Sequence, residues 1–576
     1  YYDYYQPEAY IPSRDAYIEK EAEINKEIER LRHSATRSLL SRNDVIIVAS
    51  VSCIYGLGMP EDYLKAVITI KKGDIINRHE FLSKLEASQY TRNDIELSQG
   101  TYRIKGDTID IFASWEEIIY RLEFFGDECD RLTTHHPITM NIIQTPNELK
   151  IFPATHYVVH DYKKEAIQDI RTELTQTIKA FAKDHKFVEE QRIKQRTNYD
   201  LEMIEEMGYC KGIENYSRHL SRRNPGDAPG VLLDFFPKDF ITFIDESHVT
   251  IPQIGGMYNG DQSRKQTLVD FGFRLPSAKD NRPLTFTEFE NKINQCIYVS
   301  ATPGNYEKEI TLQTPPPKTI ISPWDQHHCA QQIIRPTGLL DPIVHIRKTK
   351  GQIDNIISEI NKRIKKHERV LITTLTKQMA EDLYSYFNEL QFKSYYIHSE
   401  INALERIDIL HNLRSGKIDV LIGVNLLREG LDLPEVSLVV ILDADKQGFL
   451  RNERSLIQTI GRAARHKDGT VILYADSISE SMESAIAETQ RRRKIQQDYN
   501  KKHNIIPKSI TKKITDLRSS DRKKIELPKQ SKKITSPTDH MNAINDLKKQ
   551  MKLAAENLEF ELAATLRDQL KDLEKS

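Results

Sequence analysis

The sequence contains little cysteine and no long apolar run. Five cysteines are scattered over 576 residues, without the close spacing of metal-ligand pairs. This usage is typical of a reducing compartment, and we expect the cytoplasm. No apolar segment approaches the ~20 residues that span a membrane. The chain begins at Tyr1 rather than at methionine and shows no secretory signal. Membrane-spanning and disulfide-stapled secreted proteins are therefore not expected.

A phosphate-binding motif is also missing. No G-x-x-x-x-G-K-[ST] occurs in the sequence, so the glycine-rich loop and lysine that hold nucleotide phosphates are absent. The net charge is −1, but residues 491–537 carry sixteen Lys or Arg against four Asp or Glu, which is +12, so the remainder carries −1 − 12 = −13. This basic segment could contact nucleic acid, although a solvated linker is the commoner explanation of such a run.

The length predicts several domains, and one stretch predicts the chemistry. Single cores stop growing near roughly 250–300 residues, and this chain has 576. Residues 240–244 are typical of a strand buried on both faces, followed directly by Asp245, Glu246, Ser247 and His248. The carboxyl end of such a strand is where α/β folds bind ligands. Asp245 could hold Mg²⁺ and Glu246 could activate a water, or all four residues could form a solvated loop.

The first seventeen residues are rich in tyrosine. Prolines 7 and 12 disfavour a helix, and β-propensity favours extended strands. A protruding ribbon could stack tyrosines on unpaired bases, at roughly 1–3 kcal/mol each. The alternative, favoured by composition alone, is a sheet face covered by the rest of the protein. The tyrosines in question are Tyr1, Tyr2, Tyr4, Tyr5, Tyr10 and Tyr17.

The next 200 residues alternate between strands and helices. We expect a helix over 19–42, then a buried strand at 44–48 leading to a small-residue loop where Ser50 and Ser52 could meet a phosphate backbone. Residues 66–154 predict a small inserted α/β domain with hairpins, one at 105–107 and one at 126–128. We expect its Arg92, Arg103 and Lys105 to be exposed. Long helices follow over 160–207, and residues 252–258 predict a glycine-bearing loop.

A second α/β unit begins near residue 331. Strands predicted at 370–374, 394–397, 420–424 and 437–442 alternate with helices, which indicates a parallel sheet. A helix over 455–465 contains Gln458, Arg462 and Arg465. An arginine fork suits a polyphosphate, although solvated salt bridges are the commoner role of two arginines on a surface helix. Helical periodicity returns over 538–576, where two short helices would need a partner.

Together these stretches resemble a superfamily 2 helicase core with two RecA-like lobes. Residues 245–248, 300–302, 430–432 and 458–465 are similar to its second, third, fifth and sixth motifs. The resemblance is closer still to the UvrB family of the excinuclease ABC system. It covers nearly the whole chain, and its longest matches are residues 1–12, 48–58, 209–218, 249–258, 335–342, 425–434 and 558–568.

The resemblance implies an α/β protein that acts as the damage-recognition ATPase of bacterial nucleotide excision repair, with ATP and Mg²⁺ as cofactors. Asp245 would bind Mg²⁺, Glu246 would activate water, Arg462 and Arg465 would approach the γ-phosphate, and Asp432 and Gln458 would contact the nucleotide. The tyrosine ribbon would enter between DNA strands. Residues 66–154 would dock UvrA, and the tail, through Phe560 and Glu561, would engage UvrC.

The resemblance also divides the chain. The implied parts are 1–65, the first lobe with the ribbon; 66–154, the inserted domain; 155–330, the rest of that lobe with a helical subdomain; 331–497, the second lobe; 498–537, a basic linker; and 538–576, a C-terminal helical hairpin of the UVR type.

Two features depart from the family pattern. The P-loop that the family carries upstream of its ribbon is missing, so we expect a protein that lacks its N-terminus. Residues 309–331, with Pro315–Pro317 and His327-His328-Cys329, fit the family poorly. Two alternatives stay open: a transcription-repair coupling translocase, which should lack the UVR tail, and a truncated scaffold that binds partners or DNA without turnover.

Overall fold

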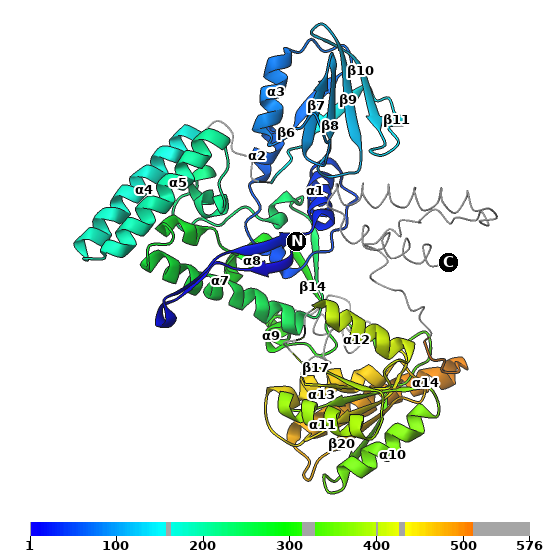
Figure 1. Ribbon diagram of the computed structural model, residues 1–576. Helices are drawn as coiled ribbons and strands as arrows, with labels where there is room; N and C mark the ends of the chain where they lie inside the picture. Colours follow the sequence, from blue (N-terminus) through cyan, green and yellow to red (C-terminus); the bar gives the residue numbers. More distant parts are fainter. Residues whose placement is uncertain are drawn as a thin grey trace, which may run out of the picture. The chain divides into compact units, whose positions relative to one another are not determined.

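The computed structural model describes residues 2–156, 163–313, 329–398, 401, 403–424 and 432–510. The chain forms two compact units, Tyr1–Gln331 and Gln332–Ser576, and each is described by itself (Figure 1). Several predicted features lie outside the described residues: Tyr1, the prolines and histidines of the 309–331 stretch, residues 425–431 and the whole tail with its predicted hairpin.

The first unit opens with a narrow antiparallel ribbon, drawn in dark blue in Figure 1. β1 (Tyr2–Gln6) pairs with β4 (Glu21–Ile24), and further out β2 (Ala9–Ile11) pairs with β3 (Ala16–Ile18) around the 3-10 turn Pro12–Arg14. The helix predicted from residue 19 is wrong at its start, because residues 21–24 pair as a strand. α1 (Lys26–Ser41) begins only where the Asn25 side chain accepts the backbone N–H of Ile28.

The strand predicted at residues 44–48 is also wrong. This segment is extended but pairs with no described strand, and Ile46 and Val48 are more than nine-tenths exposed. Its other apolar residues, Val45 and Ile47, pack on the neighbouring core. The chain then turns through the 3-10 helix Val51–Ile54 into α2 (Pro60–Lys65).

A mixed sheet, antiparallel except for the parallel pair β6–β7, forms the inserted domain and confirms both predicted hairpins. Its order is β11-β10-β9-β8-β7-β6, and β12 pairs separately with β5. Phe81 and Leu85 of α3 (Arg78–Ala87) cover the apolar face of this sheet. The strands are β5 (Ile68–Lys71), β6 (Thr91–Arg92), β7 (Thr101–Lys105), β8 (Thr108–Phe112), β9 (Ile119–Phe125), β10 (Glu128–His135), β11 (Ile142–Gln144) and β12 (Glu148–Ile151).

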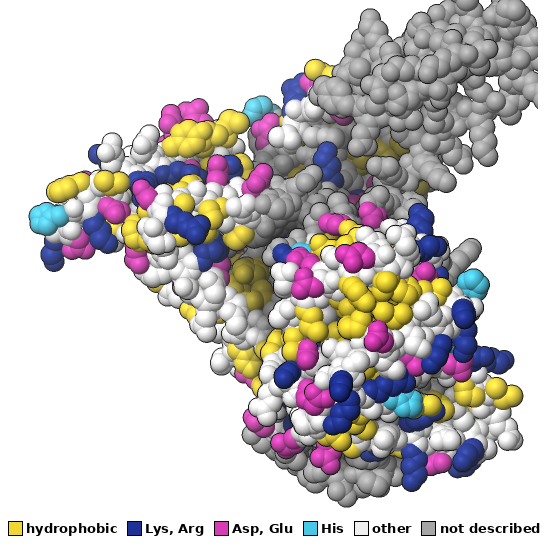
Figure 2. All heavy atoms as spheres, turned by 60° about the horizontal axis from the view of Figure 1, so that its bottom comes forward, with side chains coloured by type: hydrophobic (Ala, Val, Ile, Leu, Met, Phe, Trp, Pro, Cys, Tyr) yellow, Lys and Arg dark blue, Asp and Glu magenta, His cyan; other side chains and the backbone are white. Residues whose placement is uncertain are grey.

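Two long helices follow, as predicted. α4 (Lys163–Lys183) and α5 (Phe187–Met207) pack as an antiparallel pair with a core that includes Ile170, Ile193 and Leu201. Figure 2 shows charges of both signs interspersed over these helices on the face in view. The chain passes through the 3-10 helix Ile213–Tyr216, α6 (Ser217–Leu220) and the 3-10 helix Leu232–Phe235 before it reaches the central strands of the unit.

Two parallel strands carry the acidic motif. β13 (Ile241–Ile244) pairs with β14 (Gln295–Tyr298), and among the described residues no other strand joins them. Ile244 is buried, but Ile241 is 52% and Phe243 66% exposed, so the prediction of burial on both faces is wrong. The segments around these strands are α7 (Ser247–Asp270), the 3-10 helix Pro276–Asp280, α8 (Phe286–Lys292) and α9 (Asn305–Gln313).

The glycine-bearing loop predicted at residues 252–258 is helical instead. Pro252, Gly255 and Gly256 lie inside α7, whose Ile251 and Ile254 pack in the core. Helix-breaking propensity is here outweighed by the burial of one apolar face of the helix.

The second unit is a six-stranded parallel sheet between two helical layers. Its order is β15-β20-β19-β16-β18-β17, and cores lie on both faces. The predicted α/β class with a parallel sheet is confirmed. The strands are β15 (Ile343–Arg347), β16 (Arg369–Thr373), β17 (Ser394–Ile397), β18 (Val420–Gly423), β19 (Val436–Ile441) and β20 (Thr470–Tyr474). The helices are α10 (Gln352–Ile364), α11 (Lys377–Glu389), α12 (Ala403–Ser415), α13 (Glu453–Ile460) and α14 (Glu480–His503), with 3-10 turns at Phe449–Arg451 and Gly461–Ala463.

The helix predicted over 455–465 ends early. α13 stops at Ile460, and the chain tightens into a 3-10 turn at Gly461, so Arg462 and Arg465 do not continue the face of an α-helix. Within the described residues, no helix is long and apolar enough to cross a lipid bilayer.

Candidate nucleic-acid interface and nucleotide site

The tip of the tyrosine ribbon is docked on the first unit. The Tyr17 ring stacks on Phe273 with centroids 4.5 Å apart, and the Tyr10 ring lies 4.8 Å from Phe271. The guanidinium of Arg192 lies over Phe273, 4.2 Å from the ring centroid. Tyr10 and Tyr17 are therefore packed against the rest of the protein, as the alternative favoured by composition predicted, although Tyr17 keeps 37% of its surface exposed.

A buried ion pair fixes the same tip. The Nε of Arg274 donates to both carboxylate oxygens of Glu8, at 2.9 and 3.2 Å, and both residues are at most 6% exposed. The Tyr17 hydroxyl donates to Glu8 at 2.5 Å. Burial raises the pKa of Tyr17, and its bond to Glu8 adds to this shift. Arg274 also lies 3.6 Å from Asp200. Burial works against the charge of Arg274, but Glu8 outweighs it, so the pKa of Arg274 is raised.

Two further ion pairs hold the base of the ribbon. Lys20 donates to Glu214, and Lys211 donates to Glu19, each at 2.5 Å. The Lys211 pair is largely exposed, with side chains 69% and 62% accessible, so it should add little to stability. The buried Glu8–Arg274 pair was missed by sequence reasoning, because its partners are 266 residues apart and neither belongs to a recognisable motif.

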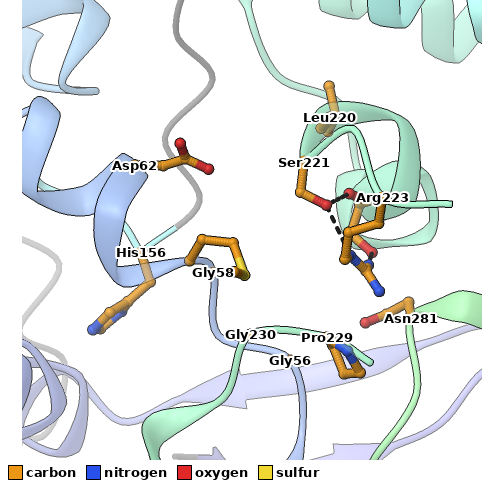
Figure 3. A pocket seen from close by; sticks show the side chains of 12 residues that line it. Gly56, Gly58, Asp62, His156, Leu220, Ser221, Arg223, Pro229, Gly230 and Asn281 are labelled. Carbon is orange, nitrogen blue, oxygen red and sulfur yellow. Dashed lines mark hydrogen bonds between the residues drawn. The ribbon is translucent and has the colours of Figure 1, made fainter. Parts of the chain in front are cut away.

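The predicted serine loop lies on the surface. Ser50 and Ser52 are exposed, and their hydroxyl oxygens are 2.6 Å apart. The chain then reaches a small hollow, in which Asp62, His156 and Arg223 come from three different segments (Figure 3). Its volume is about 50 Å³, which suits a few waters rather than a nucleotide. Arg223 donates to the hydroxyls of Ser217 and Ser221, so its guanidinium is engaged by the loop itself.

The acidic motif is held in an unusual backbone conformation. Glu246 has φ 44° and ψ 49°, in the left-handed region, directly before the first residue of α7. Such a conformation persists in a non-glycine residue only when its surroundings over-determine it. Here the Glu246 N–H donates to Asp245 Oδ1 at 3.0 Å, and the Thr250 hydroxyl donates to the Asp245 carbonyl at 2.8 Å.

The neighbouring motif supplies the remaining contacts. Ser247 is fully buried and donates from its hydroxyl to Glu307 at 2.5 Å, and its N–H donates to the Val299 carbonyl. His248 Nδ1 lies 2.8 Å from the Ser300 hydroxyl. Residues 245–248 and 300–302, predicted as two motifs, are thus joined by direct bonds. Glu307 was missed, because nothing in the sequence sets it apart from other helical glutamates.

These carboxylates fit a hydrated divalent cation. Asp245 and Glu246 follow a parallel strand, and the buried Glu246 Oε2 makes no hydrogen bond, with His248 Nδ1 3.5 Å away. A second group of ligand-type side chains, Glu368, His466 and Asp468, comes together in the second unit. There the Glu368 carboxylate already accepts bonds from Arg363 and Ser437, so that group suits a cation less well than Asp245 does.

The predicted nucleotide contacts of the second unit come from α13, the turn beyond it and the segment before β19. Arg465 Nε is 3.5 Å from Asp432 Oδ1, and both side chains are about half exposed. Gln458, near the end of α13, and Arg462, in the turn beyond it, are partly exposed. The structure therefore brings Asp432 and Arg465 together, and it places Gln458 and Arg462 in the segment directly before Arg465.

The predicted partner-binding residues of the inserted domain differ in exposure. The Arg92 side chain is 53% exposed beside Asp94, and Lys105 is exposed at the end of β7, before the hairpin turn. Arg103 was predicted to be exposed, and this is wrong, because its side chain keeps only 18% exposure against Asp110. Asp110 accepts bonds from both Arg103 and Arg121, which draws both guanidinium groups down onto the sheet. Phe560 and Glu561 lie outside the described residues.

Comparison with known proteins decides the family. The chain is 54% identical over 582 residues to the UvrABC system protein B of Synechococcus elongatus, covering all of this chain and 85% of that protein. The protein of the same name from Bacillus licheniformis is 56% identical over 582 residues, with 86% covered. The chain belongs to the UvrB family. This family is one component of the UvrABC nucleotide excision repair system.

Family models match most parts of the chain. They describe the UvrB interaction domain (68–157), the UvrB third helical domain (161–222), the helicase conserved C-terminal domain (351–467), the ultra-violet resistance protein B (473–515) and the UvrB/uvrC motif (542–576). Among solved structures, the C-terminal domain of S. cerevisiae Dbp5 aligns at 19% identity with a TM-score of 0.22, over 32% of this chain and 94% of that one.

Proposed function

We propose that this UvrB-family chain recognises damaged duplex DNA with its tyrosine ribbon. The observation that carries the proposal is the docked tip, in which Glu8, Tyr10 and Tyr17 close the ribbon onto Arg274, Phe271 and Phe273. A strand of DNA can be enclosed beneath the ribbon only when these contacts open. We infer that the base tyrosines Tyr1, Tyr2, Tyr4 and Tyr5 then meet bases that a lesion has unstacked, because extrusion costs less at a lesion.

The phosphate backbone would be held outside the ribbon. Ser50 and Ser52 are exposed and offer hydroxyls to phosphate oxygens. On the face shown in Figure 2, positive and negative side chains are interspersed rather than gathered into one basic surface. This pattern supports a binding mode in which aromatic contacts supply discrimination and the phosphate contacts supply position.

We further propose ATP with Mg²⁺ as the family cofactor. Asp245 would hold the cation, which neutralises phosphate charge when it is bound, and Glu246 would orient or deprotonate a water. Ser247, Glu307 and Ser300 would keep the left-handed loop in place and so fix the direction of both carboxylates. Gln458, Arg462, Arg465 and Asp432 would contact the nucleotide from the second unit.

The partners follow from the matched domains. We propose that the inserted domain docks UvrA through the exposed Arg92 and Lys105, and that the tail engages UvrC through Phe560 and Glu561. The UvrB/uvrC motif at residues 542–576 favours a repair protein over a transcription-repair coupling translocase. DNA repair and five unpaired cysteines are consistent with a cytoplasmic protein.

A second candidate function is a scaffold that binds DNA and partners without hydrolysing ATP. The two candidates share the ribbon and differ only in turnover.

The test of the ribbon is the binding of the full chain, in the presence of UvrA, to lesion-bearing and intact duplexes over a range of salt. Tyr4→Ala and Tyr5→Ala should reduce the preference for the lesion, because these base tyrosines would meet the unstacked bases, while the salt dependence, set by phosphate contacts, stays constant. Variants that flatten the salt dependence and keep full discrimination would refute this role.

A further inference from the structure

Two large apolar side chains stand exposed at one end of the inserted sheet. Phe125, at the end of β9, is 83% exposed, and Ile75, in the loop before α3, is 84% exposed. Glu128 pairs with Phe125 on one side and with Ile75 on the other. Residues directly opposite each other share a face and lie roughly 5 Å apart. Phe125, Glu128 and Ile75 therefore form one row across the end of the sheet.

This row lies on the face that α3 does not cover. The next residue back, Phe124, is 6% exposed and packs with Phe81 and Leu85 of α3. Side chains alternate between the two faces of a strand, so Phe125 points away from that core. Phe124 packs in the core, whereas Phe125 contributes nothing to the core of the described fold.

The charges on this face are mixed. Behind the apolar row the register places two further rows, Lys105–Thr108–Glu123–Arg131 and Arg103–Asp110–Arg121. With Glu128, and with Asp130 in the exposed bulge beside Arg131, the face carries four cations and four carboxylates, which is 4 − 4 = 0. A nucleic-acid backbone would meet these carboxylates, so the pattern disfavours a polyanion. An aromatic residue and arginines on a rigid surface are typical of the centre of a protein–protein interface.

We propose that Phe125 and Ile75 are the apolar anchor of the protein-docking surface on the inserted domain. The partner would offer an apolar pocket for Phe125, with carboxylates placed to meet Lys105 and Arg131. The inference rests on the proposed docking of UvrA to this domain. It adds an apolar anchor to the charged residues already proposed for that surface. The end of the sheet with Phe125 enters the partner, and the opposite end, with Ile138, stays in solvent.

The experiment measures the affinity of the full chain for UvrA. Phe125→Ser should weaken binding on the order of 10- to 30-fold, as for an aromatic interface anchor, and Ile75→Ser roughly 5-fold. The matched control is Ile138→Ser, because Ile138 is 79% exposed on the same domain but follows the far end of β10. It should change affinity less than about 2-fold. All three residues are exposed, so the melting temperature should stay constant.

The outcomes separate the two proposals. An unmodified chain that fails to bind UvrA overturns the proposed docking and the anchor together. An unmodified chain that binds, with Phe125→Ser binding equally well, overturns the anchor alone. Loss of affinity for duplex DNA without UvrA in Phe125→Ser would show that this end of the sheet contacts nucleic acid, which also overturns the proposal.

Discussion

At the scale of single residues, the ribbon is held by ion pairs that contribute unequally to its stability. Glu8 and Arg274 are buried, whereas Glu19 and Lys211 are exposed, although both pairs join the ribbon to the same unit. Breaking a buried pair leaves an uncompensated charge and costs far more than losing an exposed one. The tip contact should therefore control when the ribbon opens.

Glu8→Gln should destabilise the docked tip by about 3 kcal/mol, because Arg274 would keep only the more distant Asp200. Hydrogen exchange of the backbone amides of residues 9–18 measures this opening. The matched variant Glu19→Gln should cost less than about 1 kcal/mol. Equal exchange rates in the two variants would show that the buried pair does not hold the tip.

A pair of stacked histidines gives the first unit a pH dependence. His33 and His156 lie with ring centroids 4.1 Å apart, and burial lowers the pKa of His33 to about 3 and that of His156 well below its ordinary value. Below roughly pH 6.5 the unfolded chain binds protons that the folded chain refuses. Stability is therefore full above that pH and falls as the pH drops toward 3.

His33→Phe keeps a stacked ring and removes one of these sites. Between pH 6 and 5 the variant should lose stability less steeply than the unmodified chain, by about 1.4 kcal/mol per pH unit. Urea unfolding at pH 7, 6 and 5 measures the slope. An unchanged slope would mean that His33 is protonated in the folded state.

At the scale of elements, the sequence pattern predicted helices and strands correctly where burial agrees with the apolar pattern. The strands of the second unit lie between helices on both faces, so their apolar runs were sufficient. The segment at 44–48 has the same apolar content but pairs with no described strand, and α7 forms despite Pro252 because its buried face outweighs propensity. The acidic motif could be found from its order along the chain. Its bond from Ser247 to Glu307 could not be predicted, nor could the Glu8–Arg274 pair of the ribbon, because each contact joins residues far apart in the sequence.

The glycines of α7 test whether burial of its apolar face outweighs their low helix propensity. Gly256 and Gly260 lie within the helix with open space where a Cβ would stand, so alanine at either position should stabilise the first unit by about 1 kcal/mol. Thermal unfolding measures the gain. Gly272→Ala is the opposite case, since Gly272 has φ +69° and its Cβ would lie 2.4 Å from the Glu189 carbonyl oxygen. A loss of stability at Gly256 as large as that at Gly272 would contradict this account of α7.

At the scale of the whole molecule, DNA binding and ATP hydrolysis depend on different parts of the chain. The ribbon, the inserted domain and the second unit contain the parts expected for DNA and partner contacts. The acidic motif contains the carboxylates that we propose hold the cation and activate water, but the given sequence has no glycine-rich loop and lysine to hold nucleotide phosphates. Positioning of the γ-phosphate supplies most of the catalysis in phosphoryl transfer. Carboxylates alone cannot replace it.

We therefore expect the 576-residue chain to hydrolyse ATP at a background rate, with or without DNA. The matched variant is Glu246→Gln, which removes the base and keeps the size of the side chain. The two proteins should release phosphate equally slowly in a steady-state assay, while both still bind lesion-bearing duplex. DNA-stimulated turnover in the unmodified chain, lost in Glu246→Gln, would show that other groups hold the phosphates and that the chain is an active ATPase. Equal background rates with intact lesion binding would show that lesion recognition by this chain does not require hydrolysis.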